Sequence, residues 1–96
     1  MKVDFTFRNM EVSTALKDYV NEKLTRVKKL VPEPVEATIV LSVQRHNQLC
    51  EITIASEGKL YQGTESSEDM YFSIDKVMDK IQRQLRDSKQ RRSQRP

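Results

Sequence analysis

The sequence predicts an α+β fold in which two amphipathic helices cover one face of a four-stranded sheet, in the order β-α-β-β-β-α. Apolar residues of period two mark the strands, and apolar residues at three- and four-residue steps mark the two helices. The chain has 96 residues, which leaves room for one compact domain. We place this domain at residues 1–90 and expect a basic flexible tail at residues 91–96.

The first strand and the first helix follow directly from these periods. A strand is expected over residues 2–8, where Val3, Phe5 and Phe7 alternate with polar residues. Ser13 is the expected N-cap of a helix that runs to about Leu30. The prolines at positions 32 and 34 end this helix, because proline has no amide hydrogen. Its apolar residues are Leu16, Tyr19, Val20, Leu24, Val27, Leu30 and Val31.

An antiparallel hairpin is expected next. Apolar residues alternate over residues 37–43 and again over residues 50–54, on either side of the polar sequence RHNQ. Glu57-Gly58 then offers a tight turn into a short strand over residues 59–65. The inward face of this fourth strand is ambiguous, because Leu60 and Tyr61 are adjacent.

The second helix is expected to reach about Gln90. Ser66, Ser67 and Asp69 are competing candidates for its N-cap. Its helical spacing is carried by Met70, Tyr71, Ile74, Val77, Met78, Ile81 and Leu85.

Basic residues gather at both ends of the chain. The net charge is +3, but residues 1–29 carry seven Lys or Arg against four acids, residues 30–68 two against six, and residues 69–96 eight against four. Such asymmetry indicates a polyanionic partner, although basic helix ends are also common solubility features. Charge alone leaves both explanations open.

The helical period separates these cations from the predicted core. At about 100° per residue, Lys76, Lys80 and Arg83 fall within about 60° on the side opposite the apolar arc. The first helix carries its cations in its C-terminal half. If the helices lie side by side, both sets border one groove, which is the footprint of a nucleic-acid-binding protein. The predicted RNA-binding residues are Lys23, Arg26, Lys29, Lys76, Lys80, Arg83, Arg86, Lys89, Arg91 and Arg92.

The aromatic residues do not favour stacking on single-stranded bases. Only six are present, and most of them follow the apolar pattern of the core: Phe5, Phe7, Tyr19, Tyr61, Tyr71 and Phe72. Recognition of folded RNA through its shape and phosphates fits better.

The residues give no sign of catalysis, a metal or a cofactor. His46 falls in a predicted turn without a recognisable nucleophile or acid partner, and Cys50 alternates in phase with Ile52 and Ile54 as a buried residue. One Cys with one His cannot complete a four-ligand zinc site. Two glycines exclude a glycine-rich phosphate loop. We expect a non-enzymatic protein.

No apolar run is long enough to cross a membrane, and the N-terminus does not resemble a secretion signal. We therefore expect a soluble protein of the cytoplasm.

The stretch DMYFSIDKVMDKIQRQLRDSK, residues 69–89, resembles the signature of the ribosome hibernation promoting factor family, also called the sigma-54 modulation protein family. The match is carried by Asp69-Met70-Tyr71, Ile74-Asp75, Asp79-Lys80-Ile81 and Arg83-Gln84-Leu85. Weaker similarity covers nearly the whole chain.

This resemblance implies a β-α-β-β-β-α domain, similar to double-stranded-RNA-binding domains, that docks in the small ribosomal subunit and covers the mRNA and tRNA sites. It implies that positions 23, 26 and 29 and positions 80, 83 and 89 contact ribosomal RNA. Asp87 departs from a family pattern that usually has Lys there, and Arg86 is the candidate substitute.

The resemblance is to the short form of the family. It implies a translation inhibitor of stationary phase or stress that acts beside a separate ribosome modulation factor to produce inactive ribosome dimers. We expect a monomer away from the ribosome. Two alternatives stay open: a generic module for structured RNA, and an adaptor that binds an acidic protein partner, as the sigma-factor name suggests.

Overall fold

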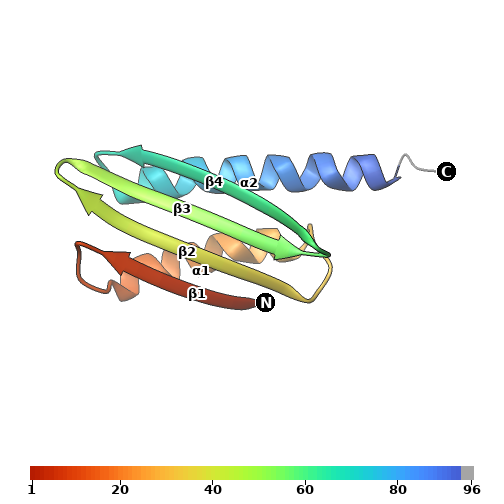
Figure 1. The fold of residues 1–96 in the computed structure, drawn as a ribbon, viewed down its shortest axis with the longest axis horizontal. Coiled ribbons are helices and arrows are strands. Elements are labelled where there is room, and N and C mark those ends of the chain that lie inside the picture. Colours follow the sequence, from red (N-terminus) through yellow and green to blue (C-terminus); the bar gives the residue numbers. More distant parts are fainter. Residues whose placement is uncertain (94–96) are drawn as a thin grey trace.

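A computed structural model describes residues 1–93, and the side chains of residues 1–88. The elements are β1 (Lys2–Arg8), α1 (Thr14–Lys28), β2 (Val35–Gln44), β3 (Asn47–Ser56), β4 (Lys59–Ser67) and α2 (Met70–Ser93). The sheet has the order β1-β2-β3-β4, with β1 parallel to β2 and the other neighbours antiparallel. Both helices lie behind the same face of this sheet (Figure 1). The predicted α+β architecture is therefore confirmed.

The core lies between the sheet and the helices. Helix α1 contributes Leu16, Val20, Leu24 and Val27, and α2 contributes Ile74, Val77, Met78, Ile81 and Leu85, all of them buried. They meet the inward residues of the two central strands, Ala37, Ile39, Leu41, Cys50, Ile52 and Ile54. These side chains come from the predicted apolar patterns of both helices and both central strands, and Val3, Phe5 and Phe7 of β1 pack against them partly buried, so the periods locate the core correctly.

Helix α1 begins as predicted and ends slightly early. The backbone N–H of Leu16 donates to Ser13 Oγ at 3.2 Å, which makes Ser13 the N-cap. The last helical residue is Lys28, two residues before the predicted end at Leu30. Lys29 caps the helix: its N–H donates to the carbonyl of Arg26 at 3.3 Å, and the N–H of Leu30 donates to the carbonyl of Val27 at 2.9 Å.

Two tight turns join the three antiparallel strands. Arg45 and His46 form a two-residue turn between β2 and β3, and Arg45 has φ of 59°. Glu57 and Gly58 connect β3 to β4 with φ of 53° and 73°. Positive φ at the first residue of such turns suits the right-handed twist of the strands. Both turns occur where the sequence predicts them, and the strands run a few residues longer than expected.

Strand β4 packs against α2. Tyr61 faces the helix, where its hydroxyl lies 2.9 Å from Ser88 Oγ, and Leu60 points outward with 73 % of its surface exposed. Gly63 is buried, and a Cβ there would lie 3.3 Å from Val77 Cγ1. Close contact between strand and helix therefore depends on a glycine at this position.

The side chain of Gln84, on α2, fills the outer edge of β4. Its Oε1 accepts from the backbone N–H of Gln62 at 3.2 Å, and its Nε2 donates to the carbonyl of Gln62 at 2.9 Å. This pair of bonds satisfies backbone groups that would otherwise face water at the sheet edge.

Of the three candidates for the N-cap of α2, the structure selects Asp69. Its Oδ1 accepts from the N–H of Tyr71 at 3.0 Å, and its own N–H donates to Ser67 Oγ at 3.2 Å. One turn further on, the buried hydroxyl of Ser73 donates to the carbonyl of Gln48 at 2.7 Å. The start of α2 is thereby held against β3.

Helix α2 ends later than predicted, and residues 94–96 of the predicted tail lie outside the described residues. The helix continues to Ser93, three residues beyond Gln90, so the backbone of Arg91 and Arg92 is helical. Neither Gly nor Pro interrupts residues 85–93, and Arg and Gln have good helix propensity. Polar composition alone does not end a helix.

Candidate nucleic-acid interface

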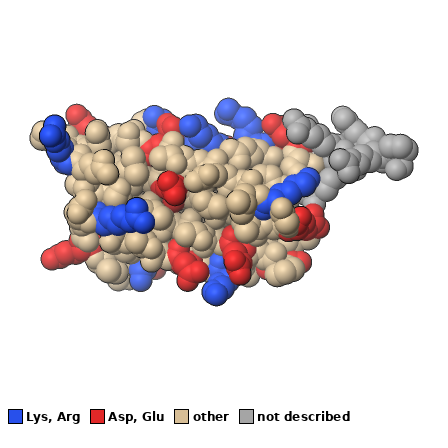
Figure 2. All heavy atoms as spheres, viewed as in Figure 1, with Lys and Arg blue, Asp and Glu red and all other residues tan. Residues whose placement is uncertain are grey.

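The cations gather on the helical side of the molecule. The helices, with the cap of α1, carry nine basic and five acidic side chains within residues 14–29 and 70–88. The opposite, open face of the sheet is formed by the outward residues of the four strands. It carries Lys2 and Arg8 against Asp4, Glu36 and Glu51. Figure 2 shows red and blue side chains mixed on this open face. The charge asymmetry of the sequence thus becomes an asymmetry between two faces.

The most exposed of the predicted cations lie toward the C-terminal half of each helix. Arg26 and Lys29 are exposed at the end of α1, and Lys80, Arg83 and Arg86 are exposed on α2. No ion pair is found for Arg26, Lys29, Arg83 or Arg86 among the described residues. These four cations are available to an anionic ligand.

Two predicted cations of α2 share a carboxylate that the sequence analysis did not identify. Glu65 on β4 has Oε1 at 3.0 Å from Lys76 Nζ and Oε2 at 2.7 Å from Lys80 Nζ. The hydrogen bond from Lys80, followed by that from Lys76, holds the pKa of Glu65 below its ordinary value. Lys76 and Lys80 therefore lean toward β4, and a phosphate must compete with Glu65 for them.

A second polar cluster joins the two helices. The hydroxyl of Tyr19 donates to Asp75 Oδ1 at 2.5 Å, and Lys23 Nζ lies 3.8 Å from the same oxygen. The hydrogen bond to Asp75, together with desolvation, raises the pKa of Tyr19 to about 12. Lys23 also lies 5.1 Å above the Tyr19 ring and is half-buried. Of the predicted residues on α1, it is the least available to a ligand.

The remaining predicted cations and Asp87 lie near the end of α2. The side chains of Lys89, Arg91 and Arg92 lie outside the described residues. Asp87 faces β4, where it lines a cavity of about 400 Å³ together with Lys59, Tyr61, Gln84 and Ser88. Asp87 is exposed and lies four residues after Arg83, on the same side of the helix as the predicted cations, so it adds a negative charge among them.

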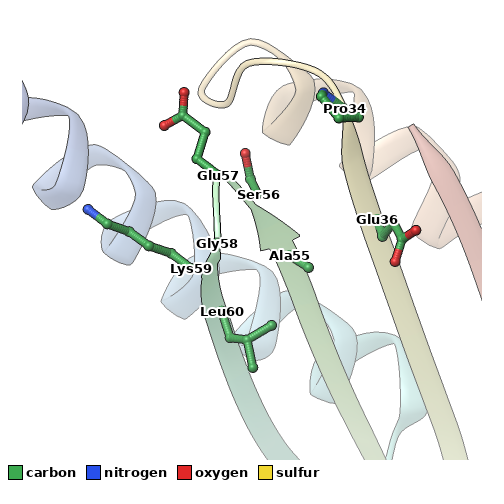
Figure 3. Close-up of a pocket in the computed structure, with 8 residues that line it drawn as sticks. All are labelled: Pro34, Glu36, Ala55, Ser56, Glu57, Gly58, Lys59 and Leu60. Atoms are coloured by element: carbon green, nitrogen blue, oxygen red, sulfur yellow. The ribbon is translucent and has the colours of Figure 1, made fainter.

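Another cavity opens at the end of the sheet, beside the β3–β4 turn (Figure 3). Its volume is about 340 Å³, and its lining is Pro34, Glu36, Ala55, Ser56, Glu57, Gly58, Lys59 and Leu60. None of the predicted RNA-binding residues lines it. It is a separate feature of the surface.

Four of the six aromatic residues pack against the core, as expected for most of them, and Tyr71 and Phe72 are exposed. Phe72 is 54 % exposed and Tyr71 is 42 % exposed. Tyr71 meets Tyr19 edge to face, with ring centroids 4.9 Å apart, and Lys76 Nζ lies 5.4 Å above the Phe72 ring. A helical projection could have identified Phe72, because it lies about 160° from Ile74.

The two residues examined for catalysis have separate environments. His46 is exposed in the β2–β3 turn. Cys50 is fully buried, as its alternation predicted, and burial raises the pKa of its thiol to about 12. Among the described side chains, no three His, Cys, Asp or Glu residues gather to hold a metal ion. Within the same part of the chain, neither helix is long and apolar enough to cross a membrane.

These features define a small two-layer α+β domain with a cationic helical side. Residues 3–93 match the model of the family described as "Sigma 54 modulation protein / S30EA ribosomal protein". The chain belongs to this family.

Relatives resemble the chain along most of its length. A protein of Pseudomonas putida named ribosome hibernation promoting factor is 33 % identical over 91 residues, which are 95 % of this chain and 89 % of that protein. A protein of Azotobacter vinelandii with the same name is 30 % identical over 95 residues, which are 99 % of this chain and 89 % of that protein. The crystal structure of the N-terminal domain of Thermus thermophilus Protein Y matches with a TM-score of 0.82 and 30 % identity, covering 88 % of this chain and 96 % of that one. The family description and these names refer to ribosomal and regulatory proteins and to no enzyme.

Proposed function

We propose that this chain is a ribosome hibernation factor that binds the small ribosomal subunit and blocks translation. The observation that carries the proposal is the similarity to ribosome hibernation promoting factors over 95 % and 99 % of the chain. The cationic helical side supports it, because ribosomal RNA presents phosphates to any protein that binds it.

The proposed mechanism is steric. The domain occupies the channel for mRNA and tRNA and draws its affinity from contacts between Lys or Arg and phosphates. Occupancy of the channel is sufficient for inhibition, so no chemical step is needed. We propose that it acts in the cytoplasm in stationary phase or stress, beside a ribosome modulation factor on the same ribosome.

Arg26, Lys29, Arg83 and Arg86 are the described residues best placed for this role, because they are exposed and no ion pair is found for them. Lys76 and Lys80 contribute after they exchange Glu65 for phosphate. Lys89, Arg91 and Arg92 extend the positive charge along the sequence toward the C-terminus.

Sedimentation of a stationary-phase lysate through sucrose gradients at low and high salt tests the proposal. The protein should move with small subunits, whole ribosomes or ribosome dimers at low salt and leave them at high salt. With about six phosphate contacts, log K should fall with log salt at a slope of about −4 to −5. Protein that stays at the top of the low-salt gradient would contradict the proposal.

A matched pair of variants locates the interface. Changing Arg83 and Arg86 together to Ala should weaken binding to purified small subunits by at least about tenfold and reduce the slope by about 1.4 to 1.8. Changing Lys2 and Arg8 to Ala removes the same charge from the open face of the sheet and should have a much smaller effect. If both double variants lost the same affinity, the effect would come from net charge alone and not from a cationic interface on the helices.

The family description favours one other function, an adaptor that binds a protein partner such as a sigma factor. Binding in a lysate distinguishes the two. An adaptor keeps its partner after nuclease treatment, whereas a factor that binds ribosomal RNA is released as the RNA is cut.

A further inference from the structure

Phe72 is an exposed apolar side chain on the charged outer side of α2. With 54 % of its surface accessible, it contributes little to the core. The residues about one turn and about three turns further on, Lys76 and Arg83, are cations. A single exposed apolar residue needs no explanation by itself. The cations and the second aromatic residue beside it distinguish this position from an ordinary surface residue.

Among the described residues, no other aromatic side chain packs on the ring of Phe72. Tyr71, by contrast, is covered on one side by the edge-to-face contact with Tyr19. Lys76 Nζ lies over the ring, 5.4 Å from its centroid. A flat ligand can therefore reach the Phe72 ring from solvent and still leave this ammonium beside it.

The combination of an open ring and flanking cations fits a single-stranded nucleotide. Nucleobases stack on aromatic side chains largely without regard to sequence, and their phosphates pair with nearby Lys and Arg. The rise of about 1.5 Å per residue puts Phe72 about 6 Å from Lys76 and about 16 Å from Arg83 along the helix axis. These spacings allow one strand to place a base on the ring and phosphates on the cations.

We infer that Phe72 is a stacking residue for an unpaired base of the bound RNA, with Lys76 holding an adjacent phosphate. This inference rests on the proposed function and adds to it, because cations alone recognise phosphates in any conformation. It also reverses the expectation that stacking is not favoured here.

Salt series on purified small subunits separate stacking from phosphate contacts. Phe72→Ala should weaken binding about five- to hundredfold at every salt concentration and leave the slope of log K against log salt unchanged. Arg83→Ala should instead reduce the slope by about 0.7 to 0.9. Phe72→Trp keeps an aromatic surface and should bind at least as tightly as the native chain.

Phe72→Leu is the matched control, because leucine keeps an apolar side chain without a π face. Full affinity in Phe72→Leu, or in Phe72→Ala, would overturn the inference and indicate an apolar contact with protein or none. Thermal melting should confirm that all variants are folded, as expected for a side chain outside the core.

A second readout is independent of the ribosome. In NMR titrations, the ring protons of Phe72 should give intermolecular NOEs to the base protons of a bound single-stranded oligouridine. Oligouridine that binds without these NOEs would contradict stacking. The NOEs without binding to small subunits would remove the proposed function and retain the inference, and binding to small subunits without the NOEs would remove the inference and retain the proposed function.

Discussion

Replacing Glu65 with Gln should strengthen binding to the small subunit. In the native protein this carboxylate holds Lys76 and Lys80 at 3.0 and 2.7 Å. The change keeps the shape of the side chain, removes its negative charge, and leaves both ammonium groups to the RNA. Most mutations in an interface weaken binding, so a predicted gain in affinity is a strict test.

The size of the effect follows from the geometry of the ion pairs. The ammonium of Lys80 lies 2.7 Å from Glu65 Oε2, and a phosphate oxygen bound on its other side would lie about 2.8 Å from it. The centre of the phosphate charge would then lie about 7 Å from the centre of the Glu65 carboxylate. In water, two like charges at about 7 Å repel by about one RT. For two phosphates, after screening, the gain is about fivefold near 0.01 M salt and about twofold near 0.15 M.

Labelled protein should be titrated with purified small subunits over a salt series at constant magnesium. The native chain, Glu65→Gln and Glu36→Gln are compared, because Glu36 is an exposed carboxylate on the open face of the sheet. Only the change at position 65 should raise the affinity, and its advantage should shrink as salt rises. Unchanged or weaker binding of Glu65→Gln, in a variant that still melts cooperatively, would refute the assignment of Lys76 and Lys80 to the interface.

Three further outcomes test the fold and the helix contacts. Ser73→Ala should lower the free energy of unfolding by about 1 to 3 kcal/mol in urea titrations, because the carbonyl of Gln48 loses a buried donor; an unchanged midpoint would contradict this. The Cys50 thiol, with its pKa raised to about 12 by burial, should resist iodoacetamide at pH 8 until the protein is unfolded, and rapid labelling of the folded protein would disagree. Tyr19 should ionise near pH 12 in ultraviolet titrations and closer to 10 in Asp75→Asn. Since its pKa is raised in the folded state, stability should fall as pH rises between about 10 and about 12, and less so in the variant.

The sequence predicts the layers of this fold well because most buried apolar residues belong to a regular period. The apolar steps from Leu16 to Leu85 recover the core, and Ser13 is found at the cap where a helix needs an acceptor. Boundaries are less well predicted. Helix α2 extends to Ser93 because no Gly or Pro stops it, whereas α1 ends at Lys28 before its prolines.

The site was only partly predictable, since its contacts join distant parts of the sequence. Periodicity places the cations on the outer side of the helices but does not reveal Glu65, whose partners are 11 and 15 residues further along the chain and belong to another element. The inward face of β4, ambiguous from sequence, is fixed by the close packing of Gly63 on Val77. Contacts of this kind require the register of strand and helix.

The bonds between Gln84 and the backbone of Gln62 have a consequence for association between molecules. An incoming strand adds to a sheet by offering an amide and a carbonyl in register, and here a side chain of the same protein already supplies both. A strand of a second molecule can bond to the backbone of Gln62 only after both of its hydrogen bonds to Gln84 have been broken. The β4 edge thus carries a built-in barrier to growth into fibrils by addition of strands from further molecules.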